Sequence, residues 1–354
     1  MTQPHEVYAA PTVDDRRMWD LWLSGLHQPS IVAAEEAGIF TALDAAPATG
    51  AELASRLGFD ERATTVLMRL LAALRLLVPR DGRYQLSDEA RTYLVKGSSW
   101  YWAPMSSVAV SEWHRSRLLE KLKQRDSALV AGPEGTPLTS TEGRAADDWA
   151  AGRVSTERAR DVAARMHAHS VPAALGVARR YDFRGVTRLL DVGGGSACFM
   201  VAAAQMHPHL RGTVLELPAM CETAKDYIRA GGVADRVETC AVDMFRQPWP
   251  RGCDALFFSN IWHDWNVRTC QWLAARAYET LPSGGRVLLH EMLLDENGDG
   301  PLTAASFSML MLLATQGQQF TPGELKDILE GAGFGQIAVV ATHTYYSVVS
   351  GCKP

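Results

Sequence analysis

The second half of this 354-residue chain alternates short β-rich runs with stretches that can each hold one helix. Such alternation predicts a parallel sheet whose strands are joined by right-handed helical crossovers, and therefore an α/β fold. A later helix-forming stretch precedes two more β-rich runs, which can add an antiparallel edge. The expected strands lie in VTRLLDVGG, RGTVLELP, DRVETCAVDMF, CDALFFSNIW and GGRVLLHEMLL, and the closing pair lies in GQIAVVATHT and YYSVVSGCKP.

The first hundred residues predict a smaller, mainly helical domain. Thr49 is placed to cap a short helix that Gly58 would end, a second helix is expected over about residues 60–77, and Asp81-Gly82 is a hairpin signal. Helix, turn, helix and hairpin make a winged-helix outline, which often binds DNA. Ten Lys and Arg against thirteen Asp and Glu in these residues disfavour DNA binding, so a dimerisation or lid role is favoured.

Composition narrows the cellular location, the cysteine chemistry and the binding partners that we expect. The sequence has no run of eighteen or more uncharged apolar residues, and its N-terminal stretch is polar and acidic, so we expect a cytoplasmic protein. Six cysteines without CxxC spacing indicate neither a disulfide framework nor a zinc ribbon. A formal net charge of −5 gives no electrostatic reason to expect a nucleic acid or a membrane as partner.

Three consecutive glycines follow the first predicted strand, which ends in Asp191. Gly193 and Gly195 fit the first two positions of the G-x-G-x-x-G pattern, but Cys198 occupies the third. The motif alone is weak, because a tight turn that binds nothing would also use glycine. Glu216 strengthens it: this residue ends the second strand twenty-one residues past Gly195, where a carboxylate can accept hydrogen bonds from a ribose.

The same loop indicates which nucleoside cofactor is bound. Cys198 takes the place of the glycine that lets a helix N-terminus meet a pyrophosphate, and the loop carries no Lys or Arg. S-adenosylmethionine has no phosphate, and Asp191 could serve its ammonium group. Asp243, after the third strand, is placed to accept a hydrogen bond from an adenine amino group. S-adenosylmethionine is therefore favoured over NAD.

Together these motifs resemble those of the plant caffeic-acid-type and bacterial polyketide-type small-molecule O-methyltransferases. The likeness runs from about residue 22 to residue 354 through LLDVGGGSA, VLELP, DRVETCAVDMF, IWHDWN, LPSGGRVLLHEMLL and GQQFTPGEL. It implies an N-terminal winged-helix dimerisation domain (1–100) in a homodimer. It also implies a methyltransferase domain (101–354) with a helical, pocket-lining part (101–180) and a Rossmann-like class I part (181–354).

The resemblance also implies a set of cofactor contacts. Ser259 stands where family members often have a lysine for the cofactor carboxylate, Trp265 would lie against the adenine, and Ser170 would lie near the methionine end. The full set of expected cofactor-binding residues is Asp191, Gly193, Gly195, Glu216, Leu217, Asp243, Met244, Ser259, Trp265 and Ser170.

His263 in WHDW matches the family's catalytic base, and an imidazole can take a proton from a hydroxyl near neutral pH. Glu291 matches the acid that orients it; because strand side chains alternate, only one of His290 and Glu291 should face the site, and we choose Glu291. Gln319 stands where plant members have a second acid. The expected substrate-binding residues are Met166, His169, Met309, Leu310 and Leu313.

These residues predict methyl transfer from S-adenosylmethionine to a phenolic hydroxyl of a small molecule. The resemblance implies a place in bacterial secondary metabolism, such as antibiotic biosynthesis. C-methylation of a phenol ring carbon, or of the enolisable carbon of a 2-oxo acid, would need the same base. The 2-oxo acid reaction could use a metal held by His263 and His290, although no metal is expected for the favoured reaction. A hypothesis of a different class is that the protein is a catalytically silent winged-helix regulator. The intact Glu216, His263 and Glu291 disfavour it.

Overall fold

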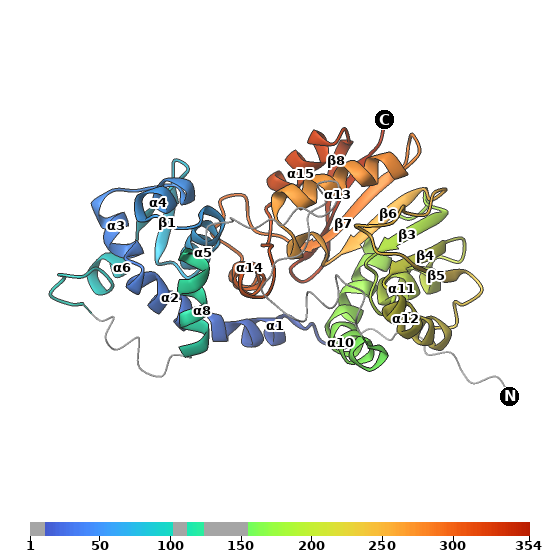
Figure 1. Ribbon diagram of the computed structural model, residues 1–354, viewed down its shortest axis with the longest axis horizontal. Coiled ribbons are helices and arrows are strands. Elements are labelled where there is room, and N and C mark those ends of the chain that lie inside the picture. The colour runs from blue at the N-terminus through green and yellow to red at the C-terminus, as the bar shows by residue number, and fades with distance from the viewer. Residues whose placement is uncertain (1–10, 102–111, 124–154) are drawn as a thin grey trace. The chain divides into compact units, whose positions relative to one another are not determined.

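The computed structural model describes residues 11–101, 112–123 and 155–354 (Figure 1). Its contacts gather the chain into two compact units, one made of Met1–Asp15, Leu129–Met292 and Glu324–Pro354 and the other of Arg16–Ala128 and Leu293–Gly323. The functional division into a dimerisation domain up to residue 100 and a methyltransferase domain after it stays a prediction. Parts of its helical segment, 102–111 and 124–154, lie outside the described residues.

The first unit is built on a seven-stranded sheet of order β5-β4-β3-β6-β7-β9-β8. Five neighbouring strands run parallel, and β9 pairs antiparallel with both β7 and β8, as the sequence predicted. The strands are β3 (Arg188–Val192), β4 (Arg211–Glu216), β5 (Val237–Ala241), β6 (Ala255–Ser259), β7 (Arg286–Met292), β8 (Gly335–His343) and β9 (Tyr346–Cys352).

Helices cover both faces of this sheet (Figure 1). α10 packs against α11 and α12, and α13 and α15 lie toward the opposite face. Central strands covered on both faces are mostly apolar, and β3, β6 and β7 are buried at almost every position. The helices are α10 (Thr156–Arg180), α11 (Cys198–Met206), α12 (Pro218–Ala230), α13 (Val267–Thr280) and α15 (Pro322–Gly331), with a 3-10 turn, η3, at Trp262–Asp264.

The second unit is mainly helical, and α14 packs against α5 and α1 within it. Its short hairpin joins β1 (Leu77–Arg80) to β2 (Arg83–Leu86). Its helices are α1 (Arg16–Leu23), α2 (His27–Glu36), α3 (Ile39–Ala45), α4 (Gly50–Leu57), α5 (Glu61–Ala73), α6 (Asp88–Tyr93), α8 (Glu112–Lys123) and α14 (Leu302–Ala314), with a 3-10 turn, η1, at Ser24–Leu26.

Local signals explain the ends of these elements. The Thr49 side chain accepts from the Glu52 N–H in a capping box, and Gly58 ends α4 in the left-handed conformation. Asp81 and Gly82 both have positive φ, which suits a two-residue hairpin turn. One expectation was wrong: the second helix ends at Ala73 rather than near residue 77, because the chain turns through Arg75 at φ +64° before β1 begins.

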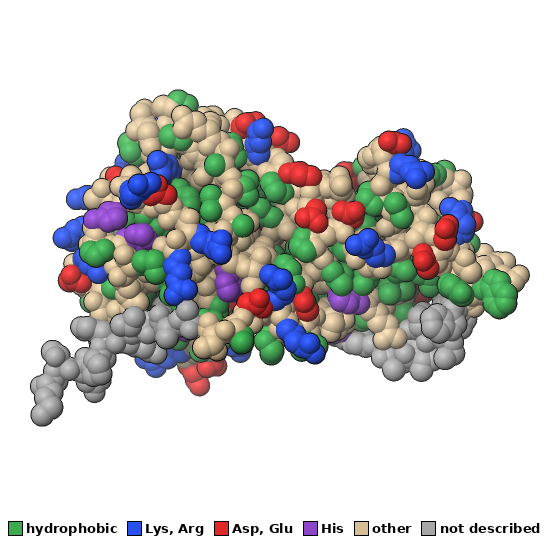
Figure 2. Space-filling view, turned by 180° about the vertical axis from the view of Figure 1, so that it is seen from behind, with side chains coloured by type: hydrophobic (Ala, Val, Ile, Leu, Met, Phe, Trp, Pro, Cys, Tyr) green, Lys and Arg blue, Asp and Glu red, His purple; other side chains and the backbone are tan. Residues whose placement is uncertain are grey.

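Within the described residues no helix is both long and apolar enough to cross a membrane. On the face of the molecule in Figure 2, Lys and Arg side chains are interspersed with Asp and Glu.

Candidate active site

The carboxyl ends of the parallel strands gather most of the predicted cofactor residues at one edge of the sheet. β3 ends at Val192 and leads through the glycine loop into α11, while β4 ends at Glu216 and β6 ends at Ser259. Asp243 and Met244 lie in the loop that follows β5. Ligands of open α/β sheets bind at this edge, outside the strand ends, so the topology places these residues where a ligand is expected.

The three glycines of the loop differ in what a side chain at each position would contact. A side chain on Gly193, at φ +72°, would meet the Ile261 side chain at 2.5 Å, and one on Gly194 would meet Asp191 Oδ2 at the same distance. Gly195, at φ +55°, would meet nothing within 4 Å. Two glycines are thus required by the protein's own packing, and the third leaves open space over the backbone. The loop is therefore both a tight turn and a place where a ligand can approach closely.

Glu216 lies against this open loop. Its Oε1 accepts a hydrogen bond from the Gly195 N–H at 3.2 Å, and its Oε2 accepts from the Leu217 N–H at 2.8 Å. Burial raises the pKa of Glu216, while the two backbone N–H groups act in the opposite direction. A carboxylate oxygen can accept more than one hydrogen bond, so Glu216 is anchored by the backbone and still able to receive two hydroxyl groups.

Asp191 is fully buried beneath the loop, and both of its carboxyl oxygens lack a hydrogen-bond partner among the described residues. Burial, with a smaller contribution from the charge of Glu216, raises the pKa of Asp191 to about 8. A buried carboxyl group without a partner is costly, and a positively charged ligand group beside it would relieve that cost. Asp191 therefore fits an ammonium or sulfonium group.

The loop after β5, together with Trp265, forms an aromatic flank at the same edge. The Phe245 N–H donates to Asp243 Oδ1 at 2.9 Å, and Trp249 Nε1–H donates to the Met244 carbonyl at 2.8 Å. The Phe245 ring meets Trp265 edge to face, with ring centroids 4.6 Å apart. This flank offers the flat apolar surface that an adenine base needs.

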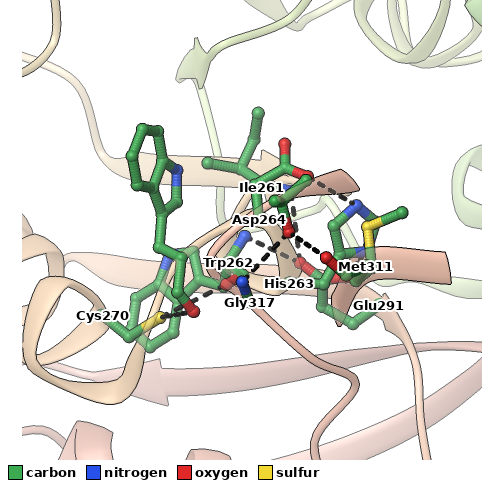
Figure 3. A network of polar contacts seen from close by, with 10 residues as sticks. Ile261, Trp262, His263, Asp264, Cys270, Glu291, Met311 and Gly317 are labelled. Atoms are coloured by element: carbon green, nitrogen blue, oxygen red, sulfur yellow. Dashed lines mark hydrogen bonds and ion pairs between the residues drawn. The ribbon is translucent and has the colours of Figure 1, made fainter. Parts of the chain in front are cut away.

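His263 and Glu291 form a buried pair beside this edge (Figure 3). The pair brings together η3, which follows β6, and the penultimate residue of β7, so that His263 Nδ1 and Glu291 Oε2 are 3.0 Å apart. Glu291 Oε1 accepts from the backbone N–H of Trp262 at 3.0 Å and of Ile261 at 3.3 Å. The carboxylate is thus fixed by the backbone, and its second oxygen faces the imidazole.

This arrangement determines the protonation of the ring. A carboxylate only accepts hydrogen bonds, so Nδ1 of His263 carries the proton and the neutral ring presents an unprotonated Nε2. Burial acts to lower the pKa of His263, but the charge and hydrogen bond of Glu291, together with Asp264, outweigh it and raise the pKa above its usual value. The pair has the geometry of a general base with an orienting acid.

The neighbouring His290 faces away from this pair. Its Nδ1 lies 2.9 Å from Ser259 Oγ, and its ring stacks on Tyr346 with centroids 4.8 Å apart. Of the two adjacent residues, Glu291 is therefore the one that contacts His263, as strand alternation predicted. Among the described residues no group of three or more His, Cys, Asp or Glu side chains gathers in a way that could hold a metal ion.

The remaining predicted residues lie on α10 or in the second unit. On α10, Ser170 is buried and Met166 is exposed, while burial and the nearby charge of His263 lower the pKa of His169. Met309 and Leu313 are buried on α14 with Leu310 half-buried between them, and the Gln319 N–H donates to Ser308 Oγ at 3.0 Å. The substrate roles of these residues, and the part of Gln319 in catalysis, stay predictions.

Sequence reasoning missed three contributors to the site. Ile261 covers Gly193, the Trp262 N–H anchors Glu291, and Phe245 pairs with Trp265. Phe245 could have been found, because it directly follows Asp243 and Met244. The other two act through a contact over a glycine and through a backbone N–H, and neither leaves a signal in residue type.

The fold and the site together are typical of one class of protein: an α/β enzyme with a candidate ligand site at the carboxyl edge of its parallel strands and a buried histidine–glutamate pair beside that edge. Comparison with known families agrees. Residues 127–335 match the O-methyltransferase domain, and residues 21–96 match the O-methyltransferase dimerisation domain. The chain belongs to the S-adenosylmethionine-dependent O-methyltransferase family, and the family, fold class and cofactor expected from the sequence are confirmed.

Similar proteins share nearly the whole length of the chain. The 3-hydroxy-5-methyl-1-naphthoate 3-O-methyltransferase of Streptomyces sahachiroi is 35% identical over 332 residues, 92% of this chain and 91% of the relative. The L-tyrosine C(3)-methyltransferase of Streptomyces lavendulae is 27% identical over 307 residues, 85% and 82% of the two chains. A crystal structure of an O-methyltransferase family 2 protein from Planctomyces limnophilus in complex with apigenin matches with a TM-score of 0.82 at 27% identity, covering 98% of each chain.

Proposed function

We propose that this protein transfers a methyl group from S-adenosylmethionine to a phenolic hydroxyl of a small aromatic molecule, with His263 as the general base. The observation that carries the proposal is the 3.0 Å contact between His263 Nδ1 and Glu291 Oε2, buried beside the carboxyl edge of the sheet. An enzyme that only bound the cofactor would have no need of an oriented base at this place.

The residues at the sheet edge fit S-adenosylmethionine. Glu216 would accept the ribose hydroxyls, the open space at Gly195 would admit the nucleoside, and the partnerless Asp191 would meet the positive charge. Phe245 and Trp265 would flank the adenine. When bound, S-adenosylmethionine supplies an electrophilic methyl group on a positively charged sulfur.

The residues of the chain then have two tasks. Binding holds the acceptor oxygen in line with the methyl group, which converts a bimolecular reaction into a positioned one. His263 Nε2 takes the proton of the acceptor hydroxyl as the new oxygen–carbon bond forms and the carbon–sulfur bond breaks. Glu291 stabilises the imidazolium and holds its Nδ1–H, so the base keeps its orientation through the transfer.

Relatives support an aromatic acceptor. The Streptomyces sahachiroi enzyme is named for a hydroxylated naphthoate, and the Planctomyces limnophilus protein was crystallised with apigenin. We infer that a hydroxylated polycyclic aromatic compound of bacterial secondary metabolism is the acceptor. The match to the dimerisation domain over residues 21–96 supports a homodimer.

Carbon methylation is the second candidate, favoured by the relative named as an L-tyrosine C(3)-methyltransferase. A phenolate can react at oxygen or at the adjacent ring carbon, and the same base serves both. Transfer from S-adenosylmethionine with a ¹³C-labelled methyl group separates them, because the methyl carbon of an aryl ether and that of an aryl methyl group have widely separated chemical shifts.

The test of the proposal is His263→Ala. This variant should bind S-adenosylhomocysteine as wild type does, while turnover of 3-hydroxy-5-methyl-1-naphthoate or a related phenol falls at least about a hundredfold, as loss of a general base requires. The matched control is His209→Ala, because His209 is exposed and its ring lies against the Phe183 carbonyl and the His207 ring, away from the carboxyl edge of the sheet. Turnover by His263→Ala within threefold of wild type would remove His263 from the mechanism.

A further inference from the structure

Arg276 on α13 is attached to the loop that follows β5, and the proposed mechanism does not use it. Its Nη2 donates to the Gln247 carbonyl. Its guanidinium carbon lies 5.3 Å from the ring centroid of Trp249 and 5.2 Å from that of Trp272. The faces of indole rings attract a cation, so the guanidinium is held against two rings while one of its donors is directed at the loop.

Gln247 connects this contact to Asp243. The Gln247 N–H donates to the Asp243 carbonyl at 3.0 Å, and Gln247 Oε1 accepts from the Asp243 N–H at 2.8 Å. Residues 243–247 thus form a turn whose two ends are joined twice, and the guanidinium holds this turn from outside. The same turn orients the Asp243 carboxylate, because Oδ1 accepts from the Phe245 N–H and Oδ2 lies 3.6 Å from Arg246 Nε.

The two tryptophans connect the guanidinium to the middle of the turn. Trp249 is buried, and its Nε1–H donates to the Met244 carbonyl at 2.8 Å. Trp272 is half-buried on α13, and its ring centroid lies 5.6 Å from that of Phe245. The side chain of Arg276 therefore reaches the turn both at its backbone and at its aromatic ring.

Covering α13 alone does not explain an arginine at this position. The Nε of Arg276 is buried and has no hydrogen-bond partner in the part of the chain that the structure describes. Burial lowers the pKa of Arg276, although the charge of Glu279 opposes the effect, so the ionised side chain has lost part of its hydration. An apolar side chain would cover the helix without this cost. An arginine adds a planar group that can lie along aromatic rings and donate in a fixed direction.

We propose that Arg276 is a positioning residue that makes the cofactor site selective for adenine. It fixes the turn, so that the Asp243 carboxylate stays directed at the amino group of the base while the Phe245 ring flanks the base. The inference rests on the proposed function, because it assumes that the adenine of S-adenosylmethionine lies at this turn. Arg276 acts through the turn and is not itself a ligand of the base.

The selectivity depends on the fixed direction of the carboxylate. Adenine presents an amino group, which donates to a carboxylate, whereas hypoxanthine presents a carbonyl oxygen at the same position, which a carboxylate repels. If the turn holds Asp243 in place, hypoxanthine cannot avoid this repulsion. If the turn is loose, the carboxylate can rotate away, which weakens the binding of adenine and removes the penalty against hypoxanthine.

Titration calorimetry with S-adenosylhomocysteine and S-inosylhomocysteine, which carry these two bases on the same ribose and amino acid, measures the selectivity. Wild type should prefer S-adenosylhomocysteine by about tenfold or more, the effect expected for one hydrogen bond to a charged group. Arg276→Met keeps a long apolar side chain; it should weaken S-adenosylhomocysteine binding about tenfold and leave S-inosylhomocysteine binding within about threefold. The matched control is Arg229→Met, because Arg229 is exposed on α12, where it pairs with Asp226. It should change neither affinity.

Kinetics separate this role from catalysis. With the phenol used to test His263, Arg276→Met should raise the KM for S-adenosylmethionine about tenfold while kcat at saturating cofactor stays within about threefold of wild type, because the base is untouched. Gln247→Ala is a second variant, chosen because Gln247 is exposed and its side chain can be removed without opening the core. It removes the acceptor of the Asp243 N–H and should lower the preference for S-adenosylhomocysteine in the same way.

Two more variants test how Arg276 acts. Arg276→Lys keeps the charge but not the planar group, so it should lose most of the preference, as Arg276→Met does. Asp243→Ala removes the carboxylate and should abolish the preference. Adding Arg276→Met to Asp243→Ala should change the preference less than about twofold, because both residues act through one hydrogen bond. An Arg276→Lys protein with wild-type preference would refute the role of the planar group.

The outcomes separate this inference from the proposed function. If Arg276→Met keeps the wild-type preference, the positioning role is refuted while the methyltransferase proposal stands. If Arg276→Met weakens both ligands by the same factor, Arg276 is only structural and the positioning role is again wrong. Equal binding of both ligands by wild type would refute the recognition of the amino group by Asp243, and the inference with it. If wild type binds neither ligand, the proposed function itself fails.

Discussion

Replacing Glu291 with Gln tests the orientation of the base with almost no change of shape. In the wild type, one carboxylate oxygen accepts from the Trp262 and Ile261 N–H groups and the other lies 3.0 Å from His263 Nδ1. A glutamine has only one oxygen, and its NH₂ group cannot face another donor. Keeping the two backbone hydrogen bonds therefore turns the NH₂ group toward His263 Nδ1.

That change forces the wrong tautomer on the base. Nδ1 of His263 must become an acceptor, so the neutral ring carries its proton on Nε2, the nitrogen that has to receive the proton of the acceptor hydroxyl. The loss of the Glu291 charge also removes the main cause that raises the pKa of His263. We expect kcat to fall by about 10²–10⁴, the range that general-base catalysis contributes.

The assay is single-turnover methyl transfer from labelled S-adenosylmethionine, with the affinity for S-adenosylhomocysteine measured alongside. Glu291→Gln should bind S-adenosylhomocysteine within about threefold of wild type, because its effect is confined to the base. The contrasting variant is Glu216→Gln, which should weaken cofactor binding because the carboxylate held by Gly195 and Leu217 is lost. A Glu291→Gln enzyme with nearly wild-type kcat would refute the tautomer argument.

Three further predictions follow from the same site. First, kcat/KM should rise with pH through a pKa above the ordinary histidine value of about 6.5, because His263 must be neutral to accept a proton and its pKa is raised; a pH-independent rate from pH 6 to 9 would contradict this. Second, because the pKa of Asp191 is about 8, binding S-adenosylhomocysteine at pH 7 should release protons as the ammonium group favours the ionised carboxylate. Binding heats measured in buffers of different ionisation enthalpy would show this release, and Asp191→Asn should abolish it. Third, Gly194→Ala should destabilise the protein by about 1–3 kcal/mol in thermal unfolding, because its added carbon would lie 2.5 Å from Asp191 Oδ2 and 2.8 Å from Val214; Gly25→Ala, which meets nothing within 4 Å and needs no positive φ, should destabilise it less.

Local signals in the sequence predicted much of the fold. The Thr49 cap, the Gly58 stop and the Asp81-Gly82 turn depend only on neighbours in the chain, and all three lie where the sequence placed them. The strands of the first unit were also predictable, because buried parallel strands are continuous apolar runs. The end of α5 was misjudged because the turn at Arg75 carries neither glycine nor proline to mark it.

The site was predictable only in part, because much of it depends on contacts between distant residues. Strand alternation correctly chose Glu291 over His290 as the residue that contacts His263. The contact of Ile261 over Gly193 joins residues far apart in the chain, and no residue type reveals it. The pairing of Ser259 with His290 likewise requires the register between β6 and β7.

The proposed function depends most directly on the identity of the ligand at the carboxyl edge of the sheet. Titration calorimetry with S-adenosylhomocysteine, repeated with NAD, tests it in one experiment. We expect saturable binding of S-adenosylhomocysteine, weakened in Glu216→Gln, and no heat of binding with NAD. Saturable binding of NAD, with no heat from S-adenosylhomocysteine, would contradict it.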